Sequence, residues 1–261
     1  MTAKVTYTRQ GDVGEIVIAH PPLNLFDAQL IEELGGAVEE AADTVPTRPR
    51  ALLVRAEGDV FTAGVDVHVF EGLDIPRADA LTASLLALTH AIEDLPFPTM
   101  AVVDGLCLTA GLELSLACDL LWASERARFG LVERVVGITP LMGGTQRMAE
   151  RAGTARAREF VFSGALYDAP TLHAWGVVNR VLAPDALLED ARAFARELAA
   201  GPTLAHAATK RVVRAQADHG TRGADERTAA LTSHLFETQD SRGAVQSFLQ
   251  EGPGRATFSG K

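Results

Sequence analysis

The sequence predicts an α/β fold that ends in a helical region, and three observations lead to this prediction. Short apolar runs typical of strands alternate with apolar residues at helical spacing through the first half of the chain. From Ala186 onward only the helical spacing recurs. The 261 residues are 47% hydrophobic and 22% charged, a composition that supports a well-packed core and excludes a disordered chain.

The first quarter of the chain predicts a β-hairpin, a helix and a strand. Polar and apolar residues alternate up to Gly11-Asp12, a tight-turn signal, and the β-branched run Ile16 to Ile18 follows it. Asp27 is a candidate N-cap for a helix, because apolar residues then recur at helical spacing through Ala41. The short apolar run at 51–56 predicts a buried strand.

The middle of the chain continues the alternation, and its end is helical. The predicted elements are helices over 77–94 and 111–118, strands over 99–103, 120–124 and 177–182, and short helices between 144 and 175. Three further helices are predicted over 186–200, 202–218 and 225–250. No fixed repeat or long linker interrupts these elements, so we expect one compact core with a helical extension.

Charge and cysteine content limit the classes of binding partner and the cellular compartment that we expect for the protein. Lys and Arg number 24 against 34 Asp and Glu, which gives a net charge of −10 without any basic run, so we expect neither nucleic acid nor an anionic membrane as a partner. Cys107 and Cys118 lie in apolar stretches, which is typical of buried, reduced thiols. No apolar N-terminal signal or membrane-spanning stretch is found, so we expect a soluble, cytoplasmic protein.

Several familiar catalytic motifs do not occur in the sequence. It contains no G-x-x-x-x-G-K-[ST] phosphate loop, no G-x-G-x-x-G dinucleotide motif, no H-E-x-x-H and no G-x-S-x-G. The seven histidines never pair with one another or with a carboxylate at metal-ligand spacing. We therefore expect no metal site, and nucleotide-binding and serine-hydrolase functions are disfavoured.

Two loops rich in small residues could bind an oxygen atom of a ligand. They are 61–66, after the strand predicted at 51–56, and 105–111, after the strand predicted at 99–103. Small residues allow close approach to backbone N–H donors, and a helix that begins near Gly111 adds its positive dipole end. Two such donors would polarise a carbonyl oxygen, whereas the alternative interpretation is a pair of tight, well-packed turns.

Two glutamates lie among apolar residues. Glu113 lies in AGLELSLA at 110–117, and Glu133 lies in FGLVERVVGI at 129–138. Burial disfavours a charged carboxylate and raises its pKa toward neutrality, where it can exchange protons with a substrate. The alternatives are a core carboxylate that caps a helix for Glu113, and an exposed or Arg134-paired carboxylate for Glu133.

Six segments in order carry a family resemblance across nearly the whole chain. They are PLNLFD at 22–27, FTAGVDV at 61–67, AVVDGLCLTAGLELSLACDLLWAS at 101–124, ARFGLVERVVGITPLMGGTQRM at 127–148, AWGVVNRV at 174–181 and QSFLQEGPGRATFSGK at 246–261. Together they resemble the enoyl-CoA hydratase/isomerase (crotonase) superfamily.

The resemblance implies a crotonase-like spiral of ββα turns over 1–195. It also implies a C-terminal helical region over 196–261 that serves in trimerisation or as a lid. The expected assembly is a homotrimer, or a hexamer made as a dimer of trimers. The implied substrate is an acyl-CoA thioester, with no metal and no cofactor other than the coenzyme A that is part of the substrate.

The resemblance also implies roles for individual residues. The N–H groups of Val65 and Ala110 would form an oxyanion hole, and Glu113 and Glu133 fall where hydratases carry their two catalytic glutamates. The substrate-binding residues it implies are Ala63, Val65, Asp66, Val67, His68, Ala110 and Gly111. The activity expected is hydration of a trans-2-enoyl-CoA.

The chain departs from the family pattern at a few of these positions. Thr109-Ala110-Gly111 replaces a triple glycine, and Ala110 can serve there only with a negative φ. Val132 replaces a proline, Arg134 follows the second glutamate, and His68 replaces a common lysine. A Δ3,Δ2-enoyl-CoA isomerase, a decarboxylase, a thioester hydrolase or a non-catalytic acyl-CoA-binding protein remain alternatives, since a fold does not fix a reaction.

Overall fold

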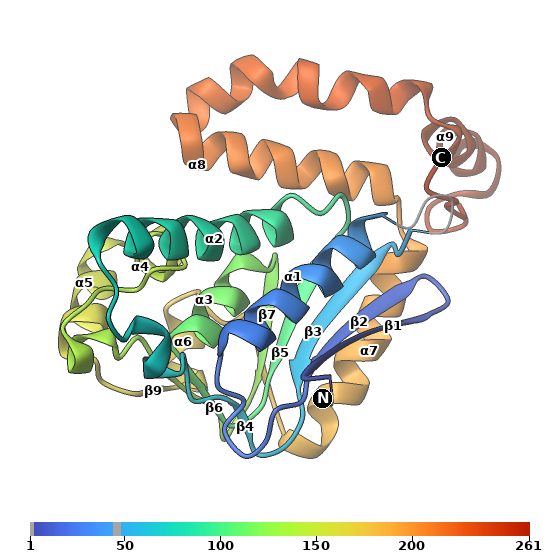
Figure 1. Cartoon of the computed structure of the whole chain (residues 1–261). Coiled ribbons are helices and arrows are strands. Elements are labelled where there is room, and N and C mark those ends of the chain that lie inside the picture. Colours follow the sequence, from blue (N-terminus) through green and yellow to red (C-terminus); the bar gives the residue numbers. More distant parts are fainter. Residues whose placement is uncertain (1–2, 44–47) are drawn as a thin grey trace.

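The polypeptide winds through two sheets in successive turns, as the computed structural model of residues 3–43 and 48–261 shows (Figure 1). A hairpin of β1 (Val5–Gln10) and β2 (Val13–Ile18) starts the larger sheet, whose strand order is β1-β2-β3-β5-β7-β10. The smaller sheet has the order β4-β6-β8-β9. All pairs are parallel except β1 with β2 and β8 with β9.

Each turn of the spiral supplies one strand to each sheet and then a helix. The turns are β3 (Ala51–Ala56), β4 (Val60–Thr62) and α2 (Ile75–Glu93); β5 (Thr99–Val103), β6 (Leu106–Leu108) and α3 (Ala110–Ala117); and β7 (Leu120–Ser124), β8 (Arg128–Gly130) and α4 (Gly144–Ala152). The first turn, of β2 and α1 (Ala28–Asp43), has only a parallel bridge between Phe26 and Val65 in place of its second strand.

The remaining elements complete the smaller sheet and the helical region. They are η1 (Val67–Phe70), η2 (Glu133–Val136), α5 (Thr154–Ser163), β9 (Tyr167–Asp168), α6 (Ala169–Ala174), β10 (Arg180–Leu182), α7 (Pro184–Ala200), α8 (Thr203–Thr232), η3 (Ser233–Glu237) and α9 (Gln239–Glu251). None of the helices in the described part of the chain is long and apolar enough to cross a membrane.

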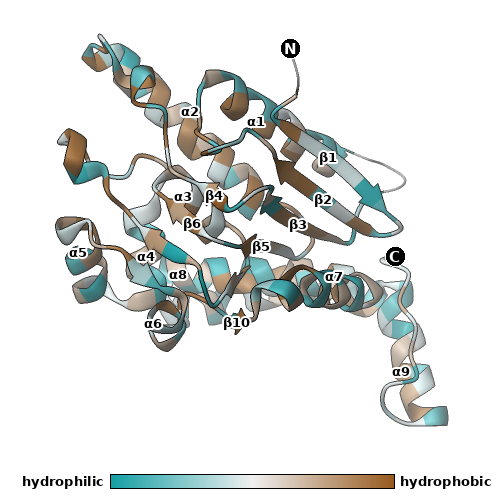
Figure 2. Ribbon diagram, turned by 90° about the horizontal axis from the view of Figure 1, so that it is seen from below, coloured by the Kyte–Doolittle hydropathy of each residue, from teal (hydrophilic) through white to brown (hydrophobic). Residues whose placement is uncertain are grey.

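The larger sheet is buried on both faces, because successive side chains of a strand point to opposite sides. Leu52 and Val54 of β3 join the main core, which includes residues of α1, α2 and α3. Leu53 of the same strand points the other way and packs with Leu187 and Ala191 of α7. The central strands β3, β5 and β7 are accordingly mostly apolar and buried, whereas the edge strand β1 is largely polar. Helix α7 lies on the sheet face opposite α1 (Figures 1 and 2).

The C-terminal helices fold back over the molecule and are fastened to it. At Gly220, φ is 68° and ψ is 173°, and the two arms of α8 run antiparallel on either side of this break (Figure 1). Arg50 donates from Nε to Thr203 Oγ1 (2.7 Å), from Nη2 to Gly201 O (2.6 Å) and from Nη1 to Phe258 O (2.9 Å). One guanidinium therefore joins the start of β3 to α8 and to the C-terminal tail.

The expected α/β class with a helical C-terminal region is confirmed, but several predicted boundaries are wrong. The single helix predicted over 225–250 is divided among the end of α8, η3 and α9, and α9 begins anew because Thr238 caps it by accepting from the N–H of Ser241 (3.1 Å). Only 180–182 of the strand predicted over 177–182 pairs, because the N–H groups of Val177 and Val178 donate back to Leu172 O. The division of the chain at residue 195 stays a prediction.

Helix starts and short strands also differ from the prediction. The predicted helix over 77–94 begins at Ile75, because Asp74 accepts from the N–H of Arg77 (3.1 Å), and the one over 111–118 begins at Ala110. The two loops predicted to be rich in small residues contain the three-residue strands β4 and β6. Both cysteines are buried, as expected.

A buried asparagine fixes β4 and the segment that leads into it. Asn24 Nδ2 donates to Glu57 O (3.0 Å) and Val60 O (2.7 Å), and its Oδ1 accepts from the N–H of His20 (2.6 Å). Its own carbonyl accepts from Thr62 Oγ1 (2.7 Å). Its φ of 49° lies in the left-handed region, which asparagine tolerates better than most residues.

Replacement of Asn24 by alanine is expected to lower the free energy of unfolding by about 2–4 kcal/mol, because three partly buried backbone groups lose their partner. Urea denaturation followed by circular dichroism measures the loss. Asn179→Ala is the matched control, since exposed Asn179 accepts one hydrogen bond, from the N–H of Leu121 (2.8 Å). Equal losses in the two variants would contradict the role assigned to Asn24.

Candidate functional site

The two loops that follow β4 and β6 lie side by side, because these strands are parallel neighbours and end at the same edge of the smaller sheet. A Cβ at Gly111 would overlap the side-chain methyl of Thr62, so the first turn of α3 packs against β4 at a distance that only glycine permits. A Cβ at Gly64 would likewise overlap Thr109 Oγ1. The start of α3 and the 63–66 loop are therefore in direct contact.

Two backbone N–H groups, of Val65 and Ala110, are free beside this contact. The bridge to Phe26 uses the carbonyl of Gly64 (2.9 Å from Phe26 N) and the N–H of Asp66 (3.1 Å from Phe26 O), so the N–H of Val65 points away from it. Ala110 begins α3, where N–H groups have no acceptor within the helix. Neither N–H donates to any group within 3–43 and 48–261.

The replacement of two glycines in Thr109-Ala110-Gly111 places backbone strain at Thr109 and not at Ala110. Ala110 keeps a negative φ, because Asn24 and Thr109 are the non-glycine residues with positive φ among those described. Thr109 has φ 45° and ψ −119°, a conformation that is costly for a β-branched residue. Its Oγ1 is also buried without a hydrogen-bond partner in the described chain.

Glu113 is held on the first turn of α3 with 2% of its surface exposed. Its Oε1 accepts from the N–H of Met142 (2.8 Å) and from the N–H of Gly144 (2.9 Å). A Cβ at Gly144 would crowd Glu113 Cγ, so this approach also requires glycine. Burial, and then the charge of Glu133, raise the pKa of Glu113 to about 8, against the opposing effect of the two N–H donors and of Arg147.

Glu133 begins η2 and is 8% exposed. Burial raises the pKa of this carboxyl to about 7, and its Oε2 has no hydrogen-bond partner among the described residues. The alternative that Glu133 is exposed or paired with Arg134 is wrong, because Arg134 turns outward and donates from Nη1 to Ser163 O (2.7 Å). With Val132 in place of proline, the Glu133 carboxyl still lies close enough for its charge to act on Glu113.

The pKa values of the two glutamates lie near neutral pH. Carboxyl groups that share a low-dielectric site do not both ionise easily, so together they retain about one proton near pH 7. A pair with one carboxylate and one carboxylic acid can accept a proton at one position and give a proton at another.

The remaining predicted binding residues form the rim beside the free N–H groups. Asp66 caps η1 by accepting from the N–H of His68 (3.1 Å), and its Oδ1 also bonds His68 Nδ1 (2.6 Å). This hydrogen bond to Asp66 raises the pKa of His68, whose side chain is exposed. Val67 is exposed as well, whereas Ala63 is held by a bond from its N–H to Leu23 O (2.9 Å).

Sequence reasoning missed the turn that holds Glu113. The N–H donors of Met142 and Gly144 stand in a turn just before α4, and the adjacent glycines 143 and 144 are the signal in the sequence that could have identified it. It also missed Arg147, which is buried beside this turn. Within the described ranges, no three His, Cys, Asp or Glu side chains are grouped to hold a metal, and the absence of a cofactor stays a prediction.

Comparisons with known proteins identify the family. The model of the enoyl-CoA hydratase/isomerase family matches residues 8–257, so the chain belongs to this family, within the crotonase superfamily. It is most like the enoyl-CoA hydratases. A "probable enoyl-CoA hydratase" of Rhizobium meliloti is 32% identical over 92% of both chains, and a carnitinyl-CoA dehydratase of Citrobacter koseri is 33% identical over 84% of this chain and 83% of its own.

Solved structures agree with this assignment. The crystal structure of an enoyl-CoA hydratase subunit from Geobacillus kaustophilus superposes with a TM-score of 0.92 at 31% identity, over 99% of this chain and 98% of that one. The structure of DspI from Pseudomonas aeruginosa gives a TM-score of 0.89 at 27% identity, with 95% of each chain covered. The ββα spiral is thus the fold of the family.

Replacement of Thr109 by glycine is expected to raise the free energy of unfolding by about 1 kcal/mol. Glycine relieves the positive-φ strain and removes a buried hydroxyl without a partner. Ala110→Gly, one residue later at a negative φ, is the matched control and is expected to lower it by about 0.5–1 kcal/mol. Denaturant titration measures both, and a loss of stability in Thr109→Gly would contradict the strain at this position.

Glu113→Gln is expected to become more stable than the wild type as pH rises. The raised pKa keeps a proton on the folded wild type that the unfolded chain releases above about pH 4.5, so wild-type stability falls from there to about pH 8. Gln keeps the Oε1 acceptor and does not titrate, so its advantage should reach the order of 2 kcal/mol at pH 9.

Denaturation of Glu113→Gln at pH 5, 7 and 9 tests this expectation. Glu189→Gln in α7 is the control, because its carboxylate is exposed and lies outside the site. A Glu113→Gln advantage that does not grow with pH would contradict a raised pKa for Glu113.

Proposed function

We propose that the protein is an enoyl-CoA hydratase, which adds water reversibly to a trans-2-enoyl-CoA thioester and gives a 3-hydroxyacyl-CoA. The observation that carries this proposal is the pair of buried carboxyls, Glu113 and Glu133, beside two free N–H donors. Relatives named as hydratases or dehydratases of CoA thioesters support it.

In this proposal the N–H groups of Val65 and Ala110 form an oxyanion hole. They donate to the thioester carbonyl oxygen, which becomes negatively charged as the substrate turns into an enolate. Donors that are already in place stabilise this charge without rearrangement, and loss of one typically costs about 100- to 1,000-fold in rate. The N-terminal end of α3 adds its positive dipole to the same place.

The two carboxyls would share the proton transfers. Both hydrogen bonds from the turn reach Oε1 of Glu113, which leaves Oε2 to take a proton from a water molecule. The water oxygen bonds to C3, the double-bond electrons move to the enolate, and C2 then takes a proton from Glu133. The step starts from the form with Glu113 ionised and Glu133 protonated, which is the less populated form of the one-proton pair because Glu113 has the higher pKa, about 8 against about 7. Glu113 ends protonated and Glu133 ionised, so the pair still holds one proton, and dehydration runs the same steps backward.

The proposal also covers substrate binding and the state of the protein. Ala63, Val65, Asp66, Val67 and His68 would line the path of the adenine and pantetheine of coenzyme A, with Ala110 and Gly111 beneath the thioester. The expected protein is a cytoplasmic homotrimer, or a hexamer of two trimers, that needs no metal or separate cofactor.

The proposal predicts that crotonyl-CoA or a longer trans-2-enoyl-CoA loses its conjugated thioester absorbance when mixed with the protein. Glu113→Gln and Glu133→Gln are each expected to lower kcat by about 100-fold or more, because proton transfer by either group is lost. The exposed Glu189→Gln control should retain wild-type kcat.

No loss of absorbance with either chain length would overturn the hydratase proposal. Formation of conjugated product from a trans-3-enoyl-CoA without hydration would favour the isomerase alternative, in which one carboxyl moves a proton between C4 and C2. Binding of acyl-CoA without turnover of any thioester would favour the non-catalytic alternative.

A further inference from the structure

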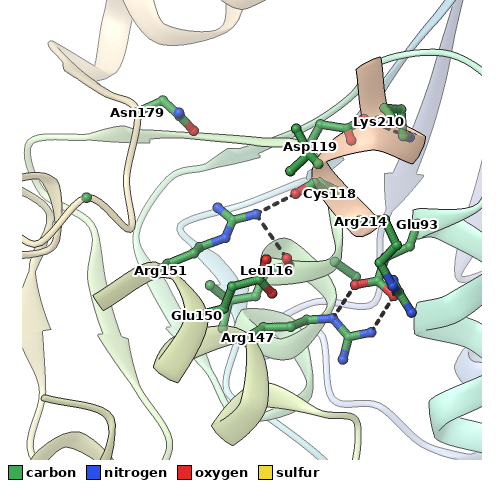
Figure 3. Close-up of a pocket in the computed structure, with 13 residues that line it drawn as sticks. Glu93, Leu116, Cys118, Asp119, Arg147, Glu150, Arg151, Asn179, Lys210 and Arg214 are labelled. Atoms are coloured by element: carbon green, nitrogen blue, oxygen red, sulfur yellow. Dashed lines mark hydrogen bonds and ion pairs between the residues drawn. The ribbon is translucent and has the colours of Figure 1, made fainter. Parts of the chain in front are cut away.

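A polar cavity of about 320 Å³ lies between α4 and the first arm of α8 (Figure 3). Four cations line it: Arg147, Arg151, Lys210 and Arg214. Each of them donates to a carboxylate or to backbone carbonyls of the chain, so the cavity is not a set of free cations awaiting an anion. Its walls are instead a network of ion pairs that joins helices far apart in the sequence.

One carboxylate forms the centre of this network. Glu93, the last residue of α2, receives two parallel bonds from Arg147, from Nε to Oε1 (2.7 Å) and from Nη2 to Oε2 (2.7 Å). Arg214 of α8 donates from Nη1 to the same Oε2 (2.8 Å). Burial alone would raise the pKa of Glu93, but the bonds from these two arginines lower it, so the carboxylate is charged at neutral pH.

The third nitrogen of Arg147 reaches the turn that holds Glu113. Nη1 lies 3.2 Å from Met142 O and 3.3 Å from Gly143 O, and a Cβ at Gly143 would overlap it. The N–H groups of Met142 and Gly144, in the same turn, donate to Glu113 Oε1. The turn is therefore held by hydrogen bonds on both sides: its carbonyls accept from Arg147, and its N–H groups donate to Glu113.

We propose that Arg147 is a positioning residue that aims the two N–H donors of the Met142–Gly144 turn at Glu113, and that Glu93 and Arg214 hold Arg147 in place. Arg147 touches no reacting atom in this proposal. The docking of α8 is thereby coupled to the geometry of Glu113. The coupling is a property of the folded chain, and only its effect on rate rests on the proposed function.

The charged groups around this path are few. Glu113 faces Glu133 from η2 and Arg147 from α4. Arg147 faces Glu93 from α2 and Arg151 from its own helix. Arg214 also faces two acids besides Glu93, Asp94 at the end of α2 and Asp218 on its own helix. Arg147 thus acts on Glu113 both by its charge and through the turn.

Arg147→Met is expected to lower kcat about 10- to 100-fold and to leave KM within about twofold of the wild-type value. The variant loses the orientation of the Glu113 carboxyl but not its contact with substrate. Loss of the positive charge favours the protonated form of Glu113, so the acidic limb of the kcat profile should move to higher pH. Arg147→Lys keeps the positive charge but lacks the planar guanidinium that makes two parallel hydrogen bonds. It should therefore restore the pH of the acidic limb more fully than it restores kcat.

Arg151→Met is the matched control. Arg151 lies one turn further along α4 and donates to Val177 O (3.2 Å), Leu116 O (3.0 Å) and Cys118 O (2.6 Å), none of which belongs to the turn. It should lose stability yet keep the wild-type pH profile. An unchanged profile in Arg147→Met, or the same shift in Arg151→Met, would overturn the proposal.

A second variant tests the same coupling if Arg147→Met does not fold. Arg214→Met removes a half-exposed side chain from the far end of the path and leaves both bonds between Glu93 and Arg147. A loss of about two- to tenfold in kcat with unchanged KM is expected. Wild-type kcat in a folded Arg214→Met protein would overturn the coupling to α8.

A measurement without substrate separates this inference from the proposed function. Thermal unfolding is measured for Arg147→Met, Glu113→Gln and their combination at pH 6 and pH 9. The shifts in Tm should be more strongly non-additive at pH 9, where Glu113 is ionised, than at pH 6. Non-additivity of this kind without hydration would reject the hydratase and keep the coupling, whereas additive shifts at both pH values would reject the coupling even in an active hydratase.

Discussion

The site depends on one steric constraint, the close approach of α3 to β4. Gly111 has no side chain, and so the first turn of the helix rests directly on Thr62. Parallel pairing of β4 with β6 then brings two loops from successive turns of the spiral to one edge, where the N–H groups of Val65 and Ala110 have no acceptor in the described chain. A side chain at position 111 would separate them, whatever the rest of the core did.

Around that contact, hydrogen bonds and ion pairs stabilise charged side chains whose burial in an apolar core would otherwise be unfavourable. Two N–H groups of a glycine turn partly compensate the burial of Glu113, and a bidentate ion pair with Glu93 compensates the burial of Arg147. Glu133 has no such compensation at Oε2. The two neighbouring carboxyls therefore have different surroundings, and this difference allows one to hold a proton while the other accepts one.

The sequence predicts the parts of this arrangement that local pattern determines. Apolar runs at 51–56, 99–103 and 120–124 identify the buried strands, and acids within apolar runs identify Glu113 and Glu133. The strands β4, β6 and β8 are three residues long, and only pairing with distant strands defines them. Arg147 belongs to an amphipathic helix, where an arginine indicates an exposed face, and its burial depends on Glu93, 54 positions earlier.

The fastening of the C-terminal tail by Arg50 has a consequence for how the chain is made. Its three acceptors follow it by 151, 153 and 208 positions, so in a growing polypeptide this arginine has only the Asp12 carboxylate (3.8 Å) as a partner until those later segments have been synthesised. The strands β1 to β7 of the larger sheet can pair long before then, since they are supplied in order along the chain. Docking of the helical region onto that sheet is therefore a late step of synthesis, and a translation product that stops before Gly201 would lack all three hydrogen-bond acceptors of Arg50.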